Sequence, residues 1–152
     1  MEDMKKIIVG VFLVMALLSQ PIQTGAYERQ APKPIEVTYE EAQELMKIAY
    51  CEAGNQGVDG QLYVLSVIIN RVNSPDYPDN VHDVIYQPYQ FATKGMNKAE
   101  VTVETHLALC ELEKGNLVPF IIAFETADSD SLKKYYTPAF TYKDHTFYTE
   151  KH

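Results

Sequence analysis

The strongest structural signal in the sequence is an amphipathic helix that carries a glutamate on its apolar stripe. Counting back from Glu52 by three, four and seven residues gives Ala49, Ile48 and Leu45. Residues at these spacings share one face of a helix, so the apolar neighbours withdraw the Glu52 side chain from water. Gly54 is a natural left-handed helix terminator, which places Glu52 in the last turn.

This position favours the protonated form of Glu52. Burial raises the pKa of a carboxyl, and the partial negative charge at a helix C-terminus acts in the same direction. A carboxyl that holds its proton near neutral pH is suited to general acid catalysis. The local pattern leaves two alternatives open: an exposed Glu on a frayed last turn, or a core Glu bonded to nearby backbone.

The sequence from about residue 38 to residue 86 predicts helices separated by short polar connections. Residues 38–41 have the form of a capping box, which predicts that the first helix begins at Thr38. A polar, glycine-rich connection follows at 55–60, and the apolar segment 61–72 has the length of a buried central helix. Residues 81–86 predict a short helical turn.

The second half mixes one helix with segments of strand character. Residues 87–91 read as an extended aromatic loop, and Asn97 with Glu100 predicts the capping box of a helix that ends at Gly115. Residues 120–124 have strand composition. The aromatic end, 135–148, contains a predicted turn at Lys143-Asp144. The sequence therefore predicts a mostly helical α+β domain.

The N-terminus has the pattern of an export signal. A lysine pair precedes the apolar run 7–18, and small residues end at Ala26. We expect a signal peptide over 1–26, a linker over 27–37 and the catalytic domain over 38–152. The protein is then secreted, with no stable membrane insertion after cleavage; an uncleaved anchor is the alternative.

Charge and composition restrict the partners. The 152-residue chain has a net charge of −8 and no basic stripe, so we expect no nucleic-acid partner. The four histidines form no metal-binding spacing, and no cofactor is expected. Seven of the eleven tyrosines, Tyr77, Tyr86, Tyr89, Tyr135, Tyr136, Tyr142 and Tyr148, fall in loops or edges. They either stack on the sugars of a neutral polymer or cover the core from outside.

The two cysteines, Cys51 and Cys110, allow either one disulfide or two free thiols. Cys51 with His145 as base raises the possibility of an amidase or peptidase. A nucleophilic thiol gains from a helix N-terminus, however, and Cys51 lies near the opposite end, where the thiolate is disfavoured. A small buried thiol is the better interpretation.

Several separate blocks together resemble the spore-cortex-lytic (SleB-like) family of cell wall hydrolases. That family reads roughly E-A-R-G-E, then G-Q, V-x-x-V-I-L-N-R-V, and near its end H-x-F-Y. The matching blocks here are E-A-G-N-Q at 52–56, G-Q at 60–61, V-I-I-N-R-V at 67–72, Y-P at 77–78, V-H-D-V-I-Y-Q at 81–87, Q-F at 90–91 and H-T-F-Y at 145–148. The resemblance covers about residues 42–148.

The resemblance implies a lysozyme-like fold and cleavage of peptidoglycan glycan strands between N-acetylmuramic acid and N-acetylglucosamine. The catalytic Glu of the family falls on Glu52. Substrate contacts are expected from Gln90, Phe91, His145 and Tyr148. The enzyme would act in the cell wall or spore envelope.

Two departures from the family pattern bear on the mechanism. Gly54 replaces the family's Arg, and Gln56 replaces its second Glu. Hydrolysis of the usual kind uses two carboxylates, whereas a lytic transglycosylase needs one. Asp59 and Asp83 could supply a second carboxylate, but the one-Glu lyase route is favoured. An N-acetylmuramoyl-L-alanine amidase and a non-catalytic peptidoglycan-binding module remain as alternatives.

Overall fold

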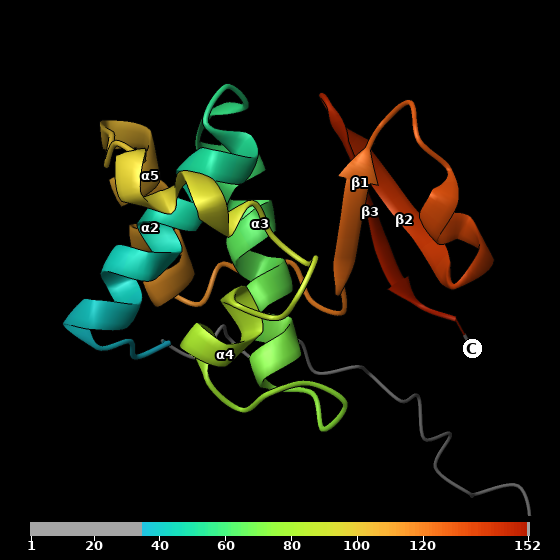
Figure 1. Cartoon of the computed structure of the whole chain (residues 1–152), viewed down its shortest axis with the longest axis horizontal. Helices are drawn as coiled ribbons and strands as arrows, with labels where there is room; N and C mark the ends of the chain where they lie inside the picture. The colour runs from blue at the N-terminus through green and yellow to red at the C-terminus, as the bar shows by residue number, and fades with distance from the viewer. Residues whose placement is uncertain (1–34, 152) are drawn as a thin grey trace, which may run out of the picture. The chain divides into compact units, whose positions relative to one another are not determined.

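Two apolar helices joined by a three-residue connection form the centre of the fold. The computed structural model describes residues 35–151, in which α2 (Tyr39–Ala53) is followed by α3 (Gly57–Val72) (Figure 1). The predicted signal peptide, 1–26, and most of the predicted linker lie outside the described residues and remain predictions. None of the described helices is long and apolar enough to span a membrane.

The predicted capping box at the start of α2 is confirmed. The Thr38 hydroxyl accepts a hydrogen bond of 3.2 Å from the backbone N–H of Glu41, whose carboxylate accepts one of 2.8 Å from the Thr38 N–H. The reciprocal bonds satisfy two backbone donors that a helix end otherwise leaves unpaired. This local interaction fixes where the helix begins and hence which face carries Glu52.

The connection between α2 and α3 differs from the prediction. Gly54 is right-handed, with φ −58° and ψ −28°, and its N–H continues the helical pattern by donating to the Tyr50 carbonyl. The expected left-handed terminator at Gly54 is therefore wrong. The chain reverses at Gly57, whose φ of +76° suits glycine because it has no Cβ. Helix α3 consequently begins four residues before the predicted Gln61.

The remaining helices enclose α3. The predicted turn at 81–86 is α4 (Val81–Ile85), followed by the 3-10 helix η1 (Thr93–Lys98) and then α5 (Val103–Glu113). The prediction of a cap at Asn97 is wrong. Thr102 caps α5 instead, because its side chain accepts from the Thr105 N–H and leaves 93–98 to form the separate 3-10 turn.

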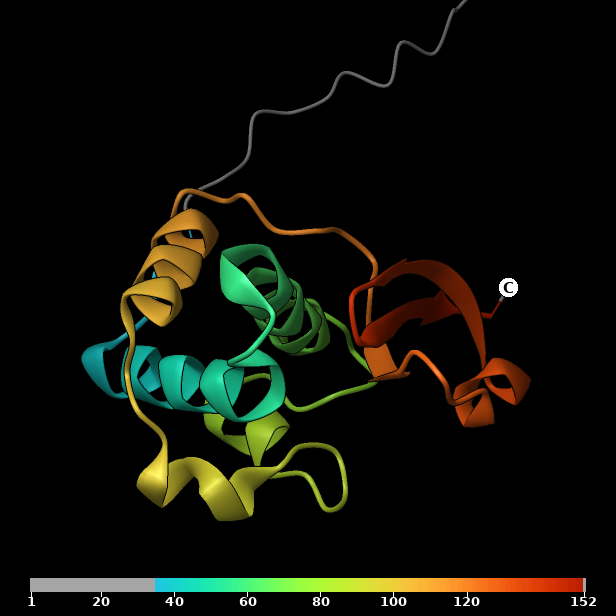
Figure 2. The same ribbon diagram turned by 90° about the horizontal axis from the view of Figure 1, so that it is seen from above.

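The helical core lies where α2, α4 and α5 pack around α3 (Figures 1 and 2). Seen from above, α2 and α5 flank α3 on one side and the sheet lies on the other (Figure 2). The sixteen buried residues of this core are Leu45, Met46, Ile48, Ala49, Ala53, Val64, Leu65, Ile68, Ile69, Val81, Val84, Ile85, Met96, Ala108, Leu109 and Leu112.

The C-terminal part forms a three-stranded antiparallel sheet in the order β1-β3-β2. Its strands are β1 (Ala123–Thr126), β2 (Tyr136–Tyr142) and β3 (His145–Glu150), and a 3-10 turn, η2 (Ser131–Lys134), precedes β2. The predicted turn at Lys143-Asp144 is confirmed as the β2–β3 hairpin turn. The predicted strand at 120–124 is displaced, because pairing with β3 begins only at Ala123.

Aromatic packing joins the sheet to α3. The Tyr63 ring meets Phe140, Tyr142 and Phe147 edge-on, with centroids 5.2, 5.1 and 5.6 Å away. Edge-to-face pairs of this kind add to the free energy gained by burying the rings. The side-chain amide of Asn70 also donates to the carbonyls of Val118 and Ile121, both at 2.8 Å. The α+β, mostly helical class predicted from the sequence is confirmed.

The capping box gives a first prediction. Thr38→Ala removes the hydroxyl that accepts from Glu41, so we expect the free energy of unfolding to fall by about 1 kcal/mol. Thr38→Ser keeps the hydroxyl and is the matched control, expected to remain close to the parent. Urea denaturation followed by circular dichroism measures both, and equal losses in the two variants would show that the cap contributes nothing.

Candidate active site

Glu52 lies in the last turn of α2 with its side chain half-buried. The backbone N–H of Ala92, forty residues further along the chain, donates a 2.5 Å hydrogen bond to its carboxylate. Burial raises the pKa of Glu52 above its ordinary value, and the Ala92 bond opposes that rise without cancelling it. The expectation of a raised pKa is confirmed with burial as its cause; the expected helix-dipole contribution stays a prediction.

The loop that supplies Ala92 is held by Arg71, which is only 4% exposed. The Arg71 guanidinium donates to the Gln90 side-chain oxygen at 3.0 Å and to the Ile122 carbonyl at 2.7 Å. It also lies 5.2 Å from the centre of the Phe91 ring, a cation–π distance. Arg71 therefore fixes the loop from α3 and, with it, the N–H that faces Glu52.

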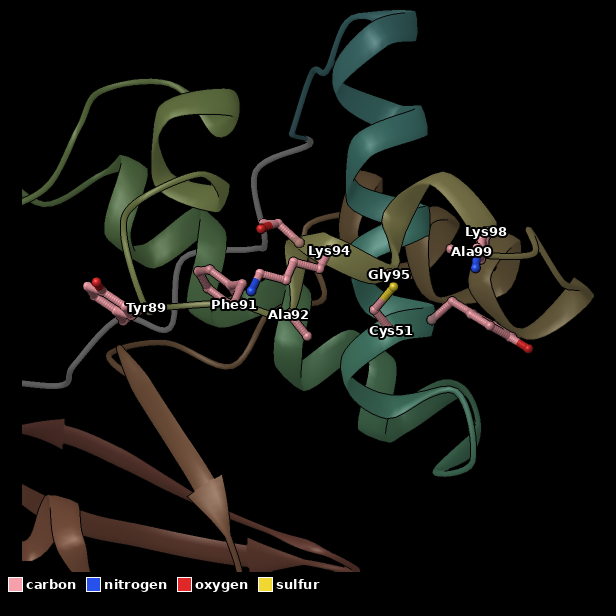
Figure 3. A pocket seen from close by; sticks show the side chains of 10 residues that line it. Cys51, Tyr89, Phe91, Ala92, Lys94, Gly95, Lys98 and Ala99 are labelled. Atoms are coloured by element: carbon pink, nitrogen blue, oxygen red, sulfur yellow. The ribbon is translucent and has the colours of Figure 1, made fainter.

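Two open hollows lie next to each other near Glu52. The smaller, of about 370 Å³, contains Glu52 itself, and the larger, of about 670 Å³, contains Ala92; both are lined by Tyr50 and Cys51. Figure 3 shows the larger hollow, where η1 passes close to the end of α2. Among the described residues that line the two hollows, Glu52 is the only carboxylate.

The larger hollow has aromatic and basic walls. Tyr89 has a left-handed backbone, with φ +64°, and its side chain is fully exposed. The other lining residues are Tyr50, Cys51, Phe91, Ala92, Thr93, Lys94, Gly95, Lys98 and Ala99. An exposed ring in a hollow that adjoins a carboxyl with a raised pKa is suited to a sugar whose glycosidic oxygen must be protonated.

His145 lies behind the site, buried in the interface between the sheet and the helices. Its Nδ1 is 3.0 Å from the side-chain nitrogen of Gln56, and its ring centre is 4.9 Å from that of Phe124. Burial lowers the pKa of His145, and the charge of Asp144 acts in the opposite direction. Because a neutral imidazole can accept at Nδ1, the pairing with the Gln56 amide fits an uncharged His145.

The β2–β3 hairpin turn is tied to the connection that follows Glu52. Lys143 donates to the Gln56 carbonyl at 2.7 Å, and Asn55 donates to the Asp144 carboxylate at 3.2 Å. Gly60 leaves room for Gln56, since a Cβ there would lie 2.5 Å from the Gln56 Cβ. These bonds fix the end of α2 against the sheet.

Tyr148 is fully buried, which does not fit the predicted direct contact with substrate. Its hydroxyl donates a 2.6 Å bond to Glu125, which also accepts from Ser129 and Ser131. Burial opposes ionisation of Glu125, but these hydrogen bonds lower its pKa to about 2. Burial and the same bond raise the pKa of Tyr148 to about 12. Any role of Tyr148 in binding is therefore indirect, through Glu125.

Cys51 and Cys110 are both free thiols, which resolves the two alternatives left open by the sequence. Burial and then the neighbouring Glu52 raise the pKa of Cys51. A thiol activated as a nucleophile has the opposite shift, so the environment of Cys51 does not favour a Cys–His amidase. In the described part of the chain, no group of three His, Cys, Asp or Glu residues is placed to hold a metal ion.

The structure links four of the five predicted site residues. Phe91 adjoins Ala92 and packs on Phe124, which in turn contacts His145. Gln90 lies in the same loop and accepts a hydrogen bond from Arg71. Sequence reasoning missed the Ala92 N–H and the role of Arg71. The available signals for Arg71 were its charge at the end of a largely apolar helix and its place in the matched block at 67–72.

Comparisons with known proteins agree with this fold. A family model described as Cell Wall Hydrolase matches residues 55–148, beginning just after Glu52. The spore cortex-lytic enzyme of Halalkalibacterium halodurans is 38% identical over 64 residues, and that of Bacillus subtilis is 40% identical over 47. These matches cover 42% and 31% of this chain but only 19% and 15% of the relatives.

Two solved structures share the fold. The catalytic domain of the germination-specific lytic transglycosylase SleB from Bacillus anthracis has a TM-score of 0.64 at 20% identity, covering 77% of this chain and all of that one. The catalytic domain of the Bacillus cereus SleB protein has a TM-score of 0.61 at 22% identity, covering 76% and 95%. The expected lysozyme-like α+β fold is thereby confirmed.

The environment of Glu52 gives a second prediction, on stability. A carboxyl whose pKa is higher in the folded than in the unfolded chain is destabilising once pH exceeds the unfolded value, here 4.5. We expect Glu52→Gln to be more stable than the parent at pH 7, and this gain to vanish at about pH 4 and below.

Chemical denaturation between pH 3.5 and 7.5 measures this difference. Glu36→Gln removes an exposed carboxylate outside the site and is the control for the change in net charge. A stability difference between parent and Glu52→Gln that does not change with pH would mean that the pKa of Glu52 is the same in the folded and unfolded chains.

Proposed function

Because this chain belongs to the cell wall hydrolase family, we propose that it cleaves peptidoglycan glycan strands between N-acetylmuramic acid and N-acetylglucosamine. Glu52 is the catalytic acid and base in this proposal. The support comes from three sources: the family, the fold shared with two SleB catalytic domains, and a carboxyl whose pKa burial raises beside open, aromatic hollows.

The observation that carries the reaction type is the single carboxylate in the two adjoining hollows. Glycoside hydrolysis of the usual kind needs a second carboxylate, either as nucleophile or to activate water. Position 56, where the family has its second Glu, holds a buried Gln bonded to His145. Asp59 and Asp83 are exposed and line neither hollow. We therefore favour a lytic transglycosylase, the activity for which the Bacillus anthracis SleB protein is named.

The proposed reaction balances with Glu52 alone. Its carboxyl gives a proton to the glycosidic oxygen as the bond from that oxygen to C1 of the muramyl residue breaks. The resulting carboxylate takes the proton of the muramyl 6-hydroxyl, and that oxygen bonds to C1 to close a 1,6-anhydro ring. Glu52 is protonated again at the end, and no water is consumed.

The Ala92 N–H has a defined part in this cycle. It donates to the Glu52 carboxylate and so stabilises the charged form that exists between the two proton transfers. Burial favours the neutral form that begins and ends the cycle. The two opposing effects keep the carboxyl able to give and to take a proton.

The other predicted site residues take supporting roles in the proposal. Phe91 lines the larger hollow and offers its ring to a sugar, and exposed Gln90 offers an amide held by Arg71. His145 positions Gln56 and Phe124 from behind. Tyr148 acts only through Glu125.

The proposed place of action is the cell wall or spore envelope. Both curated relatives are named spore cortex-lytic enzymes, and a polymeric wall substrate lies outside the membrane. The predicted signal peptide at 1–26 agrees with export.

The third prediction tests the role of Glu52. Glu52→Gln keeps an acceptor for the Ala92 N–H but cannot transfer a proton, so we expect kcat to fall by about 10²- to 10⁴-fold. Release of soluble fragments from purified peptidoglycan measures kcat, and cosedimentation with insoluble peptidoglycan shows that binding is retained. Glu36→Gln is the control. Undiminished fragment release by Glu52→Gln would indicate another catalytic group, and binding without any release by the parent would indicate a binding module.

The fourth prediction concerns the product. Digestion in water enriched in ¹⁸O, followed by mass spectrometry, should yield muropeptides ending in 1,6-anhydromuramic acid without ¹⁸O. Reducing-end muramic acid that carries ¹⁸O would establish hydrolysis instead. Free peptides beside uncleaved glycan strands would establish an amidase.

A further inference from the structure

We propose that the larger hollow binds carboxylates carried by the lactyl arm of the muramyl residue, and that Lys94 and Lys98, on opposite sides of the hollow, recognise them. This inference rests on the proposed function and names the part of the substrate that the hollow would hold. It would make the two lysines specificity-determining residues, separate from the proton chemistry of Glu52.

The position of the hollow connects it to the reacting bond. Ala92 lines it and donates to Glu52, and the hollow shares the walls Tyr50 and Cys51 with the smaller one that contains Glu52. A group attached to the sugar at Glu52 therefore has the larger hollow directly beside it. Figure 3 shows Lys94 near the start of η1 and Lys98 at its end, with Cys51 between them in the view.

The charge of the hollow is opposite to that of the protein. The chain has a net charge of −8, yet two exposed lysines line the hollow and no acidic residue does. Within residues 35–151, neither Lys94 nor Lys98 has an ion-pair partner, whereas Lys114 pairs with Glu111. Lysines without a protein partner are available to an anionic ligand, and a hollow concentrates their field.

The chemistry of the proposed substrate supplies a matching anion. The sugar rings, hydroxyls and N-acetyl groups of a peptidoglycan strand are neutral. Its negative charges lie on the lactyl arm of muramic acid, as the lactyl carboxylate itself or as the carboxylates of a peptide attached there. Both sources present a carboxylate to the side of the muramyl ring.

The aromatic rim suits the uncharged part of the same group. Tyr89 is fully exposed to solvent and has a left-handed backbone, and Phe91 lines the hollow beside Ala92. Non-glycine residues in this backbone region are found preferentially at functional sites. The rings would cover a sugar face or an apolar peptide side chain while the lysines meet the charge.

The experiment compares the double variant Lys94→Gln/Lys98→Gln with a matched control on three forms of one strand preparation. The forms are intact peptidoglycan strands, strands whose peptides an amidase has removed so that the lactyl carboxylate remains, and strands whose carboxylates are coupled to methylamine. The control, Lys47→Gln/Lys133→Gln, removes the same charge from positions that line neither hollow.

We expect the hollow variant to lose about tenfold in kcat/KM on intact strands, mainly through KM, because each exposed ion pair is worth roughly a factor of two to five. On methylamine-coupled strands it should equal the parent. A loss on intact strands assigns the carboxylates of the attached peptide, because the lactyl carboxyl is there bound in an amide, and a loss confined to amidase-treated strands assigns the lactyl carboxylate instead. Equality with the control on every form would overturn the inference.

Failure of this inference is distinguishable from failure of the proposed function. A parent protein that releases no fragments from any strand contradicts the proposed function, whereas a parent that cleaves charged and neutralised strands equally well contradicts only the lysine site. Should the double variant not fold, the parent protein alone can test the lysine site. Its kcat/KM on intact strands must then fall with added salt more steeply than on neutralised strands.

Discussion

The hydrogen bond from the Ala92 N–H to Glu52 is the interaction on which the candidate site depends. It joins the end of α2 to a loop forty residues away, and it places that loop over the carboxyl. Arg71 makes the contact possible by holding the loop from α3 through Gln90 and Phe91. Without these bonds the carboxyl would face solvent at the end of a helix, where neither its pKa nor its direction would be controlled.

Two opposing effects set the chemistry of Glu52. Burial favours the protonated acid, and the Ala92 N–H favours the carboxylate, with burial the larger of the two. The same surroundings raise the pKa of Cys51. One environment therefore supports a carboxylic acid and suppresses a thiolate. This difference is the physical reason to prefer glycan cleavage by Glu52 over a thiol-based reaction on the same polymer.

Local signals in the sequence predicted the elements that local interactions determine. The capping box at Thr38, the apolar stripe ending at Glu52 and the turn at Lys143 each depend on neighbours within a few residues. Thr102, rather than Asn97, caps α5, and β1 begins at Ala123 because pairing with β3 sets its register. The start of β1 depends on β3, a partner distant in the chain, whereas two nearby capping patterns were available for α5 and only the one at Thr102 is used.

The candidate site was likewise predictable only where neighbours close in the sequence determine it. Glu52 was identified because its burial follows from the helix that carries it. Ala92 and Arg71 were not, because a backbone donor has no sequence signature and the contacts of Arg71 span three elements. Tyr148 was identified in a matching motif, yet its side chain is fully buried and its hydroxyl donates to Glu125 of β1.

The central claim is that the folded chain holds the Glu52 carboxyl as an acid with a raised pKa. Carbon-13 NMR of the side-chain carboxyl, assigned by comparison with Glu52→Gln, measures that pKa directly in the parent protein. We expect the titration midpoint of Glu52 to lie above 4.5, the ordinary value for a glutamate. A midpoint at or below 4.5 would contradict the claim and remove the basis for Glu52 as the proton donor.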